Sequence, residues 1–88
     1  DSKATLYPNP VVNELTLDLD VVNSIDELSV SIFDASGRIV RKDAIIDFDV
    51  ASGLKTYKID VREFTKGVYS MKIKLDRKEI VKKLIIVD

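Results

Sequence analysis

The chain has 88 residues, of which 45% are hydrophobic and 33% are charged, and its formal net charge is −1. This length and composition predict one soluble globular domain with a single core. Histidine, cysteine and tryptophan are absent, which excludes disulfides, histidine-dependent nucleophile pairs and the usual zinc sites, and removes one of the best anchors for a sugar ring.

The first residues, 1–5, are expected to be the frayed end of a linker from an upstream region, with the folded domain spanning 6–88. No signal peptide opens the chain, so the leader of an exported protein would lie on a longer precursor.

A proline-containing segment, Tyr7-Pro8-Asn9-Pro10, lies near the start of the predicted domain. Each proline holds the residue before it extended and cannot donate to a sheet ladder, which predicts a position at a sheet edge or strand start. The segment either packs Leu6 or Tyr7 against the domain or is an exposed element that a partner recognises.

Apolar and polar residues then alternate along most of the chain, as half-buried antiparallel strands require. The alternation predicts strands at 15–19, 28–32, 48–50, 57–61 and 69–75, and shorter evidence adds 39–40 and 79–87. In each strand the apolar residues, Phe48 and Val50 among them, should face the core. Polar stretches at 23–27, 51–55 and 76–78 are predicted turns. The pattern indicates an all-β, immunoglobulin-like antiparallel β-sandwich of about seven short strands.

Two of the turns have specific residue patterns. Asp34-Ala35-Ser36-Gly37 fits a type I hairpin turn, in which Asp34 accepts backbone N–H bonds, Gly37 takes positive φ and Arg38 begins the return strand. Gly67 permits a bend before the strand that Tyr69 begins. This arrangement resembles the tyrosine corner of immunoglobulin-like sandwiches, in which the hydroxyl bonds back to the preceding loop.

The last third of the chain is basic. Residues 66–88 carry seven basic and three acidic side chains, against seven basic and twelve acidic ones before them. The terminal run at 79–87 also has a helical pattern, but its isoleucines and valines favour a strand. Its apolar residues on both faces indicate a strand that is covered on both sides or awaits a partner. The lysines are either solvated guards of an edge strand or a docking surface for an anionic or complementary partner.

Other site chemistries receive little support. The pairs Asp18/Asp20 and Asp47/Asp49 lack the converging loop oxygens of a calcium site and are interpreted as solvated faces. We expect no catalytic residue, metal or cofactor, and no small-molecule substrate. Nucleic acid is a poor candidate partner, because the basic residues alternate with aliphatic ones and lack stacking aromatics.

Taken in order, the landmarks resemble the type A C-terminal sorting domain of proteins carried by the type IX secretion system. Such domains have a Tyr-Pro-Asn-Pro segment, an Asp-x-x-Gly-Arg hairpin, a Leu-x-x-Gly-x-Tyr element and a terminal strand of lysine and β-branched residues. Here Phe64 stands where the family often has leucine, and the chain ends in Asp88 where many members end near a lysine. The resemblance covers nearly the whole chain.

The resemblance implies a non-catalytic sorting signal on a larger cargo protein. The cargo would cross the periplasm, be read by the outer-membrane translocon, and be cut by a sortase-like peptidase at the upstream linker. It would then be attached to the cell surface or released. An open edge of the terminal strand would allow strand addition to a partner, or self-association. The resemblance assigns the sorting motif to Tyr7, Pro8, Asn9, Pro10, Asp34, Gly37, Arg38, Gly67, Tyr69, Lys82, Lys83, Leu84, Ile85, Ile86 and Val87.

Two alternatives remain open from the residues alone. One is a fibronectin-like or carbohydrate-binding module that tethers a secreted enzyme, in which Tyr7 and Tyr57 would stack on a sugar. The other is a spacer without a ligand. An internal position in the precursor would favour either of them over a sorting signal.

Overall fold

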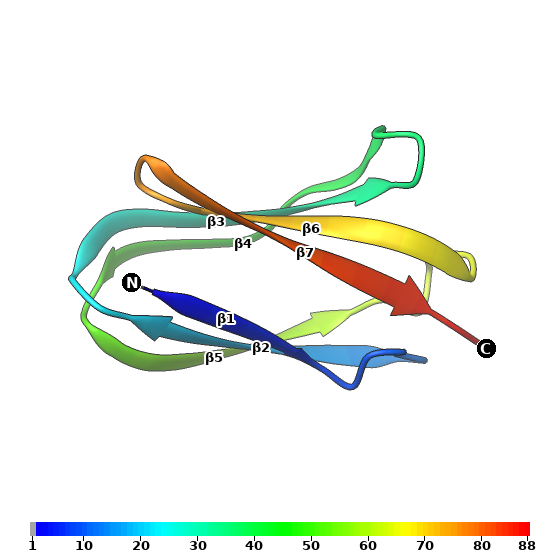
Figure 1. Cartoon of the computed structure of the whole chain (residues 1–88), viewed down its shortest axis with the longest axis horizontal. Coiled ribbons are helices and arrows are strands. Elements are labelled where there is room, and N and C mark those ends of the chain that lie inside the picture. Colours follow the sequence, from blue (N-terminus) through cyan, green and yellow to red (C-terminus); the bar gives the residue numbers. More distant parts are fainter. Residues whose placement is uncertain (1) are drawn as a thin grey trace.

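The computed structural model describes residues 2–88, which form strands and connecting turns without any helix (Figure 1). No segment in this range can therefore cross a membrane as a helix. In chain order the strands are β1 Lys3–Tyr7, β2 Glu14–Val21, β3 Ile25–Asp34, β4 Ile39–Val50, β5 Gly53–Asp60, β6 Gly67–Leu75 and β7 Lys78–Ile86.

The strands form two sheets that pack face to face. One has the order β1-β2-β5 and the other β4-β3-β6-β7, and all pairings in both are antiparallel. Figure 1 shows β1 and β7, each at the edge of its sheet, along the same side of the sandwich. The predicted immunoglobulin-like β-sandwich of about seven strands is confirmed.

The core lies between the sheets and is built by the alternating residues of the central strands. Because side chains alternate between the two faces of a strand, every second residue points inward. The fully buried side chains, with relative exposures below 2%, are those of Val11, Leu15, Leu17, Leu19, Val21, Leu28, Val30, Ile32, Val61, Met71, Ile73 and Leu84. They come from both sheets, so the hydrophobic contact across the sandwich holds the two layers together.

The segment after β1 passes from one sheet to the other. β1 ends at Tyr7, and the Tyr7-Pro8 and Asn9-Pro10 bonds that follow are both cis. Val11 then forms a parallel bridge with Ile86 of β7 and is fully buried. The first strand therefore belongs to the three-stranded sheet, and its continuation pairs with the edge of the four-stranded sheet.

The N-terminus differs from the sequence-based prediction. Residues 3–5 belong to β1 and pair with β2, and Ala4, opposite Leu19, is only 6% exposed. The expectation of a frayed end is therefore wrong for residues 3–5. Asp1 lies outside the described residues.

The middle of the chain differs as well. β4 joins the predicted strands at 39–40 and 48–50 into one, so the expected total is met only because β1 adds another. Phe48 is 61% exposed whereas Val50 is 3% exposed, so the predicted common face is wrong. Asp49 between them has φ of 51°, which interrupts the alternation of an extended strand. The predicted turns at 23–27 and 51–55 are also shorter, because β3 begins at Ile25 and β5 at Gly53.

Candidate recognition surface

The free edge of β7 is partly covered by residues 9–11, which we name the N-terminal clasp. The side chain of Asn9 acts as a short piece of strand: its Nδ2 donates to the Lys83 carbonyl at 3.0 Å, and its Oδ1 accepts from the Ile85 N–H at 3.0 Å. The Val11 N–H donates to the Ile85 carbonyl, and the Val87 N–H donates to the Val11 carbonyl, both at 2.9 Å. The clasp therefore fixes the end of the terminal strand to the start of the chain.

The two faces of β7 have different roles. On the inner face, Leu84 is fully buried and Ile86 is 3% exposed, opposite Tyr69 and Gly67 of β6. On the outer face, Val81 is 61% exposed and Lys83 is also exposed. The residues of the predicted motif at 82–87 therefore have two different roles. Leu84 and Ile86 stabilise the fold, whereas Lys83 is accessible to a partner.

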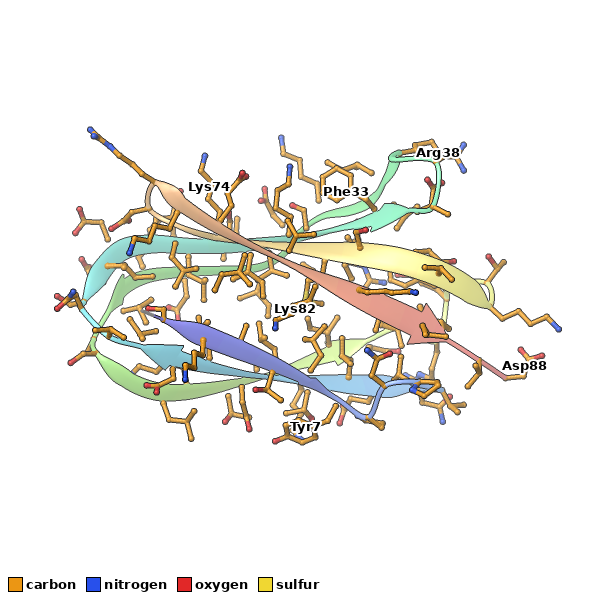
Figure 2. The ribbon with its side chains drawn as sticks, in the orientation of Figure 1. Tyr7, Phe33, Arg38, Lys74, Lys82 and Asp88 are labelled. Carbon is orange, nitrogen blue, oxygen red and sulfur yellow. The ribbon has the colours of Figure 1, made fainter. Side chains whose placement is uncertain are left out.

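Lys82 occupies an unusual position on this strand. By register it stands opposite the buried Met71, on the side of β7 that faces the other sheet, and it is partly exposed. Figure 2 shows Lys82 in the opening between β7 and β1. An inward-pointing charge on an edge strand opposes pairing with another copy of the same edge. Strand-edge self-association is therefore disfavoured at this position.

The outer face of β6 and β7 is basic. Lys72, Lys74 and Lys83 all project from it, since the register pairs Lys72 with Val81 and Ser70 with Lys83. Figure 2 places Lys74 on the same outer side of the sheet as Phe33. The Lys72 ammonium lies 5.1 Å from the Phe33 ring centroid and 3.8 Å from the nearest carboxylate oxygen of Glu79. This face offers positive charge beside apolar surface.

The hairpin between β3 and β4 has the predicted turn. Asp34 Oδ1 accepts from the backbone N–H groups of Ser36 and Arg38, each at 3.0 Å, and Gly37 has φ of 88°. The Ser36 hydroxyl donates to the same oxygen at 2.7 Å. This bond is the main reason that the pKa of Asp34 is lowered. The prediction of a hairpin at Asp34-Ala35-Ser36-Gly37 is confirmed.

The sequence landmarks converge at one end of the sandwich. Asp34 pairs with Tyr69, and Tyr69 pairs with Leu84. Gly67, at the start of β6, is opposite Ile86, whose neighbour Ile85 is held by Asn9. The hairpin, the start of β6, the end of β7 and the clasp thus lie side by side, although they are distant in the sequence. Arg38 and Asp88 mark this end in Figure 2.

The tyrosine corner is also present. The Tyr69 hydroxyl donates to the Thr65 carbonyl at 2.6 Å, as predicted. Phe64 stacks on Tyr69 with ring centroids 5.7 Å apart, and the Arg41 guanidinium lies 4.5 Å from the centroid of Phe64. Arg41 also pairs with Glu63. The Arg41 contact was not predictable from local sequence patterns, because Arg41 lies on β4, far from this loop in the chain. The cluster anchors the loop before β6.

Replacing Tyr69 with phenylalanine should lower the free energy of unfolding by about 1 kcal/mol, because the partly buried contacts of its hydroxyl with the Thr65 carbonyl and the Thr65 hydroxyl are lost while the ring is kept. Urea denaturation measures the change. Tyr7→Phe is the matched control, since its hydroxyl donates to Asp18 at an exposed position and its loss should cost less than about 0.5 kcal/mol. Equal losses in the two variants would contradict a special role for the corner.

One carboxylate of each aspartate pair connects neighbouring strands. Asp18 accepts from the Tyr7 hydroxyl at 2.9 Å and from the Thr56 hydroxyl at 2.8 Å, which links the three strands of one sheet. Asp47 accepts from the Tyr57 hydroxyl at 2.7 Å, which joins β4 to β5 across the other open side. Within residues 2–88, no group of side chains suited to a metal ion comes together. The hydroxyl groups of Tyr7 and Tyr57 each donate to a carboxylate on another strand.

Alkaline pH should weaken the Tyr57–Asp47 bond. Partial burial, and then the hydrogen bond to Asp47, raise the pKa of Tyr57 from 10.0 to about 12. A raised folded-state pKa gives stability that is complete below pH 10.0 and is lost as the pH rises toward about 12. The free energy of unfolding, compared between the wild type and Tyr57→Phe by urea denaturation, should therefore differ less as the pH passes through this range. A constant difference would show that the tyrosine does not titrate in this way.

Comparison with known proteins agrees with the landmarks. The sequence model of the family described as "Secretion system C-terminal sorting domain" matches residues 5–87. No curated protein matches significantly. Among solved structures, dimeric latent PorU from Porphyromonas gingivalis superposes with a TM-score of 0.69 at 20% identity, over 98% of this chain and 9% of that chain. The likeness supports the fold, and this chain spans about a tenth of the length of that protein. The chain belongs to the secretion system C-terminal sorting domain family, the C-terminal sorting signals of proteins secreted by the type IX system.

Proposed function

We propose that this domain directs an attached upstream cargo to the outer-membrane translocon of the type IX secretion system, which reads the outer face and free edge of β7. Sorting domains of this family are not themselves catalytic, and their cargo reaches the cell surface or is released. The domain is thus a folded address, and its terminal strand is the part that we assign to recognition.

The observation that carries this proposal is the position of β7. It is the edge strand of its sheet, its outward residues Val81 and Lys83 are exposed, and the clasp holds it in one geometry. An edge strand offers backbone donors and acceptors to a partner, and its side chains supply selectivity. The inner residues Leu84 and Ile86 anchor the strand in the core, so the folded domain presents it to a receptor as an edge strand of fixed geometry.

We also propose a position for the processing that follows transport. We assign cleavage by the sortase-like peptidase to the linker before Lys3, because Lys3 already belongs to β1 and pairs with Asp20. A peptidase needs an extended, unpaired substrate, and backbone that is hydrogen-bonded in a sheet does not meet this need. The cargo would cross the periplasm before this step and be attached to the surface or released after it.

A reporter fusion tests the proposal. A periplasmic reporter with a leader peptide is joined to residues 1–88 and expressed in a host with the secretion system and in the same host lacking it. We expect the reporter at the cell surface or in the medium only when both the domain and the system are present. Periplasmic retention in the competent host, or equal export from both hosts, would overturn the proposed function. The reporter without the domain is the control.

A further inference from the structure

We infer that residues 78–82 of β7, which we name the open edge, form with the depression beside them a seat for one extended acidic segment of the secretion machinery. The segment would add as a further strand to the four-stranded sheet and place an apolar side chain near Leu75 and Ile80. The inference rests on the proposed function and specifies which part of β7 is read and by what chemistry.

The clasp determines which backbone groups remain available. The N–H and C=O of Ile85 point away from β6, because they bond to Asn9 and Val11. Backbone groups alternate in direction along a strand, so those of Glu79 and Val81 also point away from β6. Within residues 2–88, β7 pairs with no strand but β6, and the clasp reaches no further back than Lys83. The outward groups of Glu79 and Val81 are therefore available to a partner.

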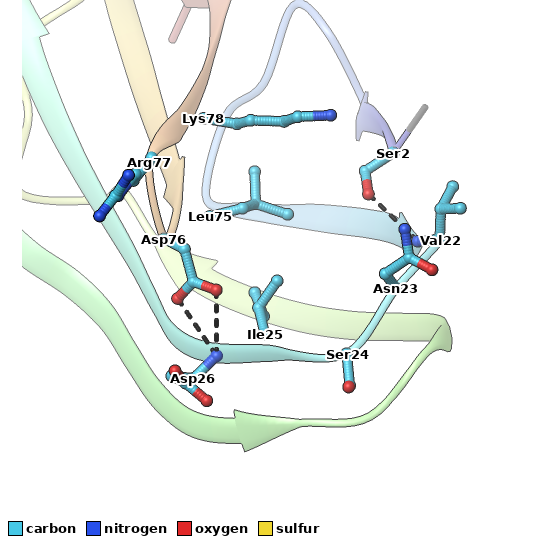
Figure 3. Close-up of a pocket in the computed structure, with 10 residues that line it drawn as sticks. All are labelled: Ser2, Val22, Asn23, Ser24, Ile25, Asp26, Leu75, Asp76, Arg77 and Lys78. Carbon is cyan, nitrogen blue, oxygen red and sulfur yellow. Dashed lines mark hydrogen bonds between the residues drawn. The ribbon is translucent and has the colours of Figure 1, made fainter.

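A depression adjoins this edge where β7 begins. Its volume is about 700 Å³, and a smaller neighbour of about 320 Å³ is lined by Ser2, Leu75, Lys78, Glu79 and Ile80. Leu75 is 4% exposed and Ile80 is partly buried, so the floor is apolar. Figure 3 shows the Lys78 side chain extended over Leu75 toward Ser2. A strand added beside β7 would direct alternate side chains into this hollow.

The shape of the depression is held by hydrogen bonds. Asp76, in the turn between β6 and β7, accepts from the backbone N–H of Asp26 at 3.1 Å (Figure 3). It also accepts from the backbone N–H of Glu27 at 3.0 Å. These bonds join the turn to the start of β3. The wall next to the open edge is thus preorganised, which lowers the entropic cost of binding.

The charges select the class of partner. On the open edge the basic residues Lys78 and Lys82 outnumber Glu79, and Arg77 directly precedes them. The depression is also lined by Asp26 and Asp76, and the Asp76 carboxylate is occupied by its bonds to backbone N–H groups. A second copy of β7 would bring like charges together, whereas acidic side chains would be attracted. An anionic glycan or lipid would match the lysines, but it lacks the regularly spaced backbone donors and acceptors that the outward groups of Glu79 and Val81 require. An acidic, extended polypeptide segment with an apolar anchor fits both features.

Val81→Pro tests the strand addition in the reporter fusion. Proline removes the outward N–H of residue 81, which the β6–β7 ladder does not use, so the domain should still fold. A partner strand would lose this bond and meet the proline ring, and export should fall about tenfold or more. Val81→Ala keeps the N–H while it shortens the exposed side chain, so its export should fall less than that of Val81→Pro. Thermal unfolding of the isolated variants checks that both are folded.

A pair of charge reversals provides a second test that does not depend on a proline. Arg77→Glu should lower export because it repels an acidic segment at the open edge, whereas Lys74→Glu, on the outer face of β6, should not. If the wild-type fusion is not exported, the proposed function fails. If the wild type and a folded Val81→Pro are exported equally, the seat is wrong. Equal losses in both charge reversals with normal export of Val81→Pro would indicate an anionic ligand bound by charge alone, and would overturn the strand addition.

Discussion

Replacing Leu84 with alanine should lower the free energy of unfolding by about 2–5 kcal/mol, the range for truncating a buried leucine. Leu84 is fully buried and pairs with Tyr69 across the β6–β7 ladder. The variant loses the transfer free energy of the removed carbons and leaves a cavity between the sheets. Small domains have about 5–15 kcal/mol of stability in total, so a loss of this size threatens folding at physiological temperature. Urea denaturation measures the change.

Lys83→Ala is the matched control, because Lys83 is the adjacent residue on β7 and its side chain is exposed. Its free energy of unfolding should change by less than about 0.5 kcal/mol. If the two variants are equally stable, the inner face of β7 does not contribute to the core as described.

The difference expected between Leu84→Ala and Lys83→Ala also affects how truncation experiments are interpreted. Deleting residues 80–88 removes Leu84 and Ile86 with the outward residues, so a secretion defect after truncation cannot separate recognition from folding.

The fold was predictable wherever burial of one face gives a local pattern. Leu15, Leu17 and Leu19 alternate with polar residues, and all three are fully buried on β2. Strand β1 was not predicted from the sequence, because the strand is short and its inward residues, Ala4 and Leu6, form only a weak apolar pattern. Its strand conformation depends on pairing with β2, which is a tertiary interaction. The prediction that Phe48 faces the core was wrong for a different reason. Asp49 has a left-handed backbone conformation, which changes the face on which its neighbours lie.

The candidate surface was predictable residue by residue but not as an arrangement. The turn at Asp34 and the corner at Tyr69 follow from local chemistry, and both were found at the expected atoms. The role of Asn9 was not predictable, because its partners Lys83 and Ile85 lie at the other end of the chain. Only the sandwich topology, which places the segment after β1 beside β7, brings these residues together.

Asn9→Ala should lower the free energy of unfolding by about 1–3 kcal/mol, since the side chain makes two hydrogen bonds to the backbone of β7. The expected result is also local. The Ile85 N–H loses its acceptor, so its hydrogen exchange should become about tenfold faster or more, as followed by NMR. Asn9→Asp keeps an acceptor for Ile85 but loses the donor to the Lys83 carbonyl, and should give an intermediate effect.

Asn13→Ala is the matched control for the clasp. Asn13 belongs to the same connection between β1 and β2, and its backbone carbonyl, which accepts from the Val61 N–H at 2.9 Å, is kept when the side chain is removed. Its stability and the Ile85 exchange rate should stay close to the wild type. If Asn9→Ala destabilises the domain without faster exchange at Ile85, Asn9 acts through the chain around its prolines and not through β7. Faster exchange at Ile85 with little change at the central strand β3 would show that Asn9 holds the terminal strand in the geometry that a receptor meets.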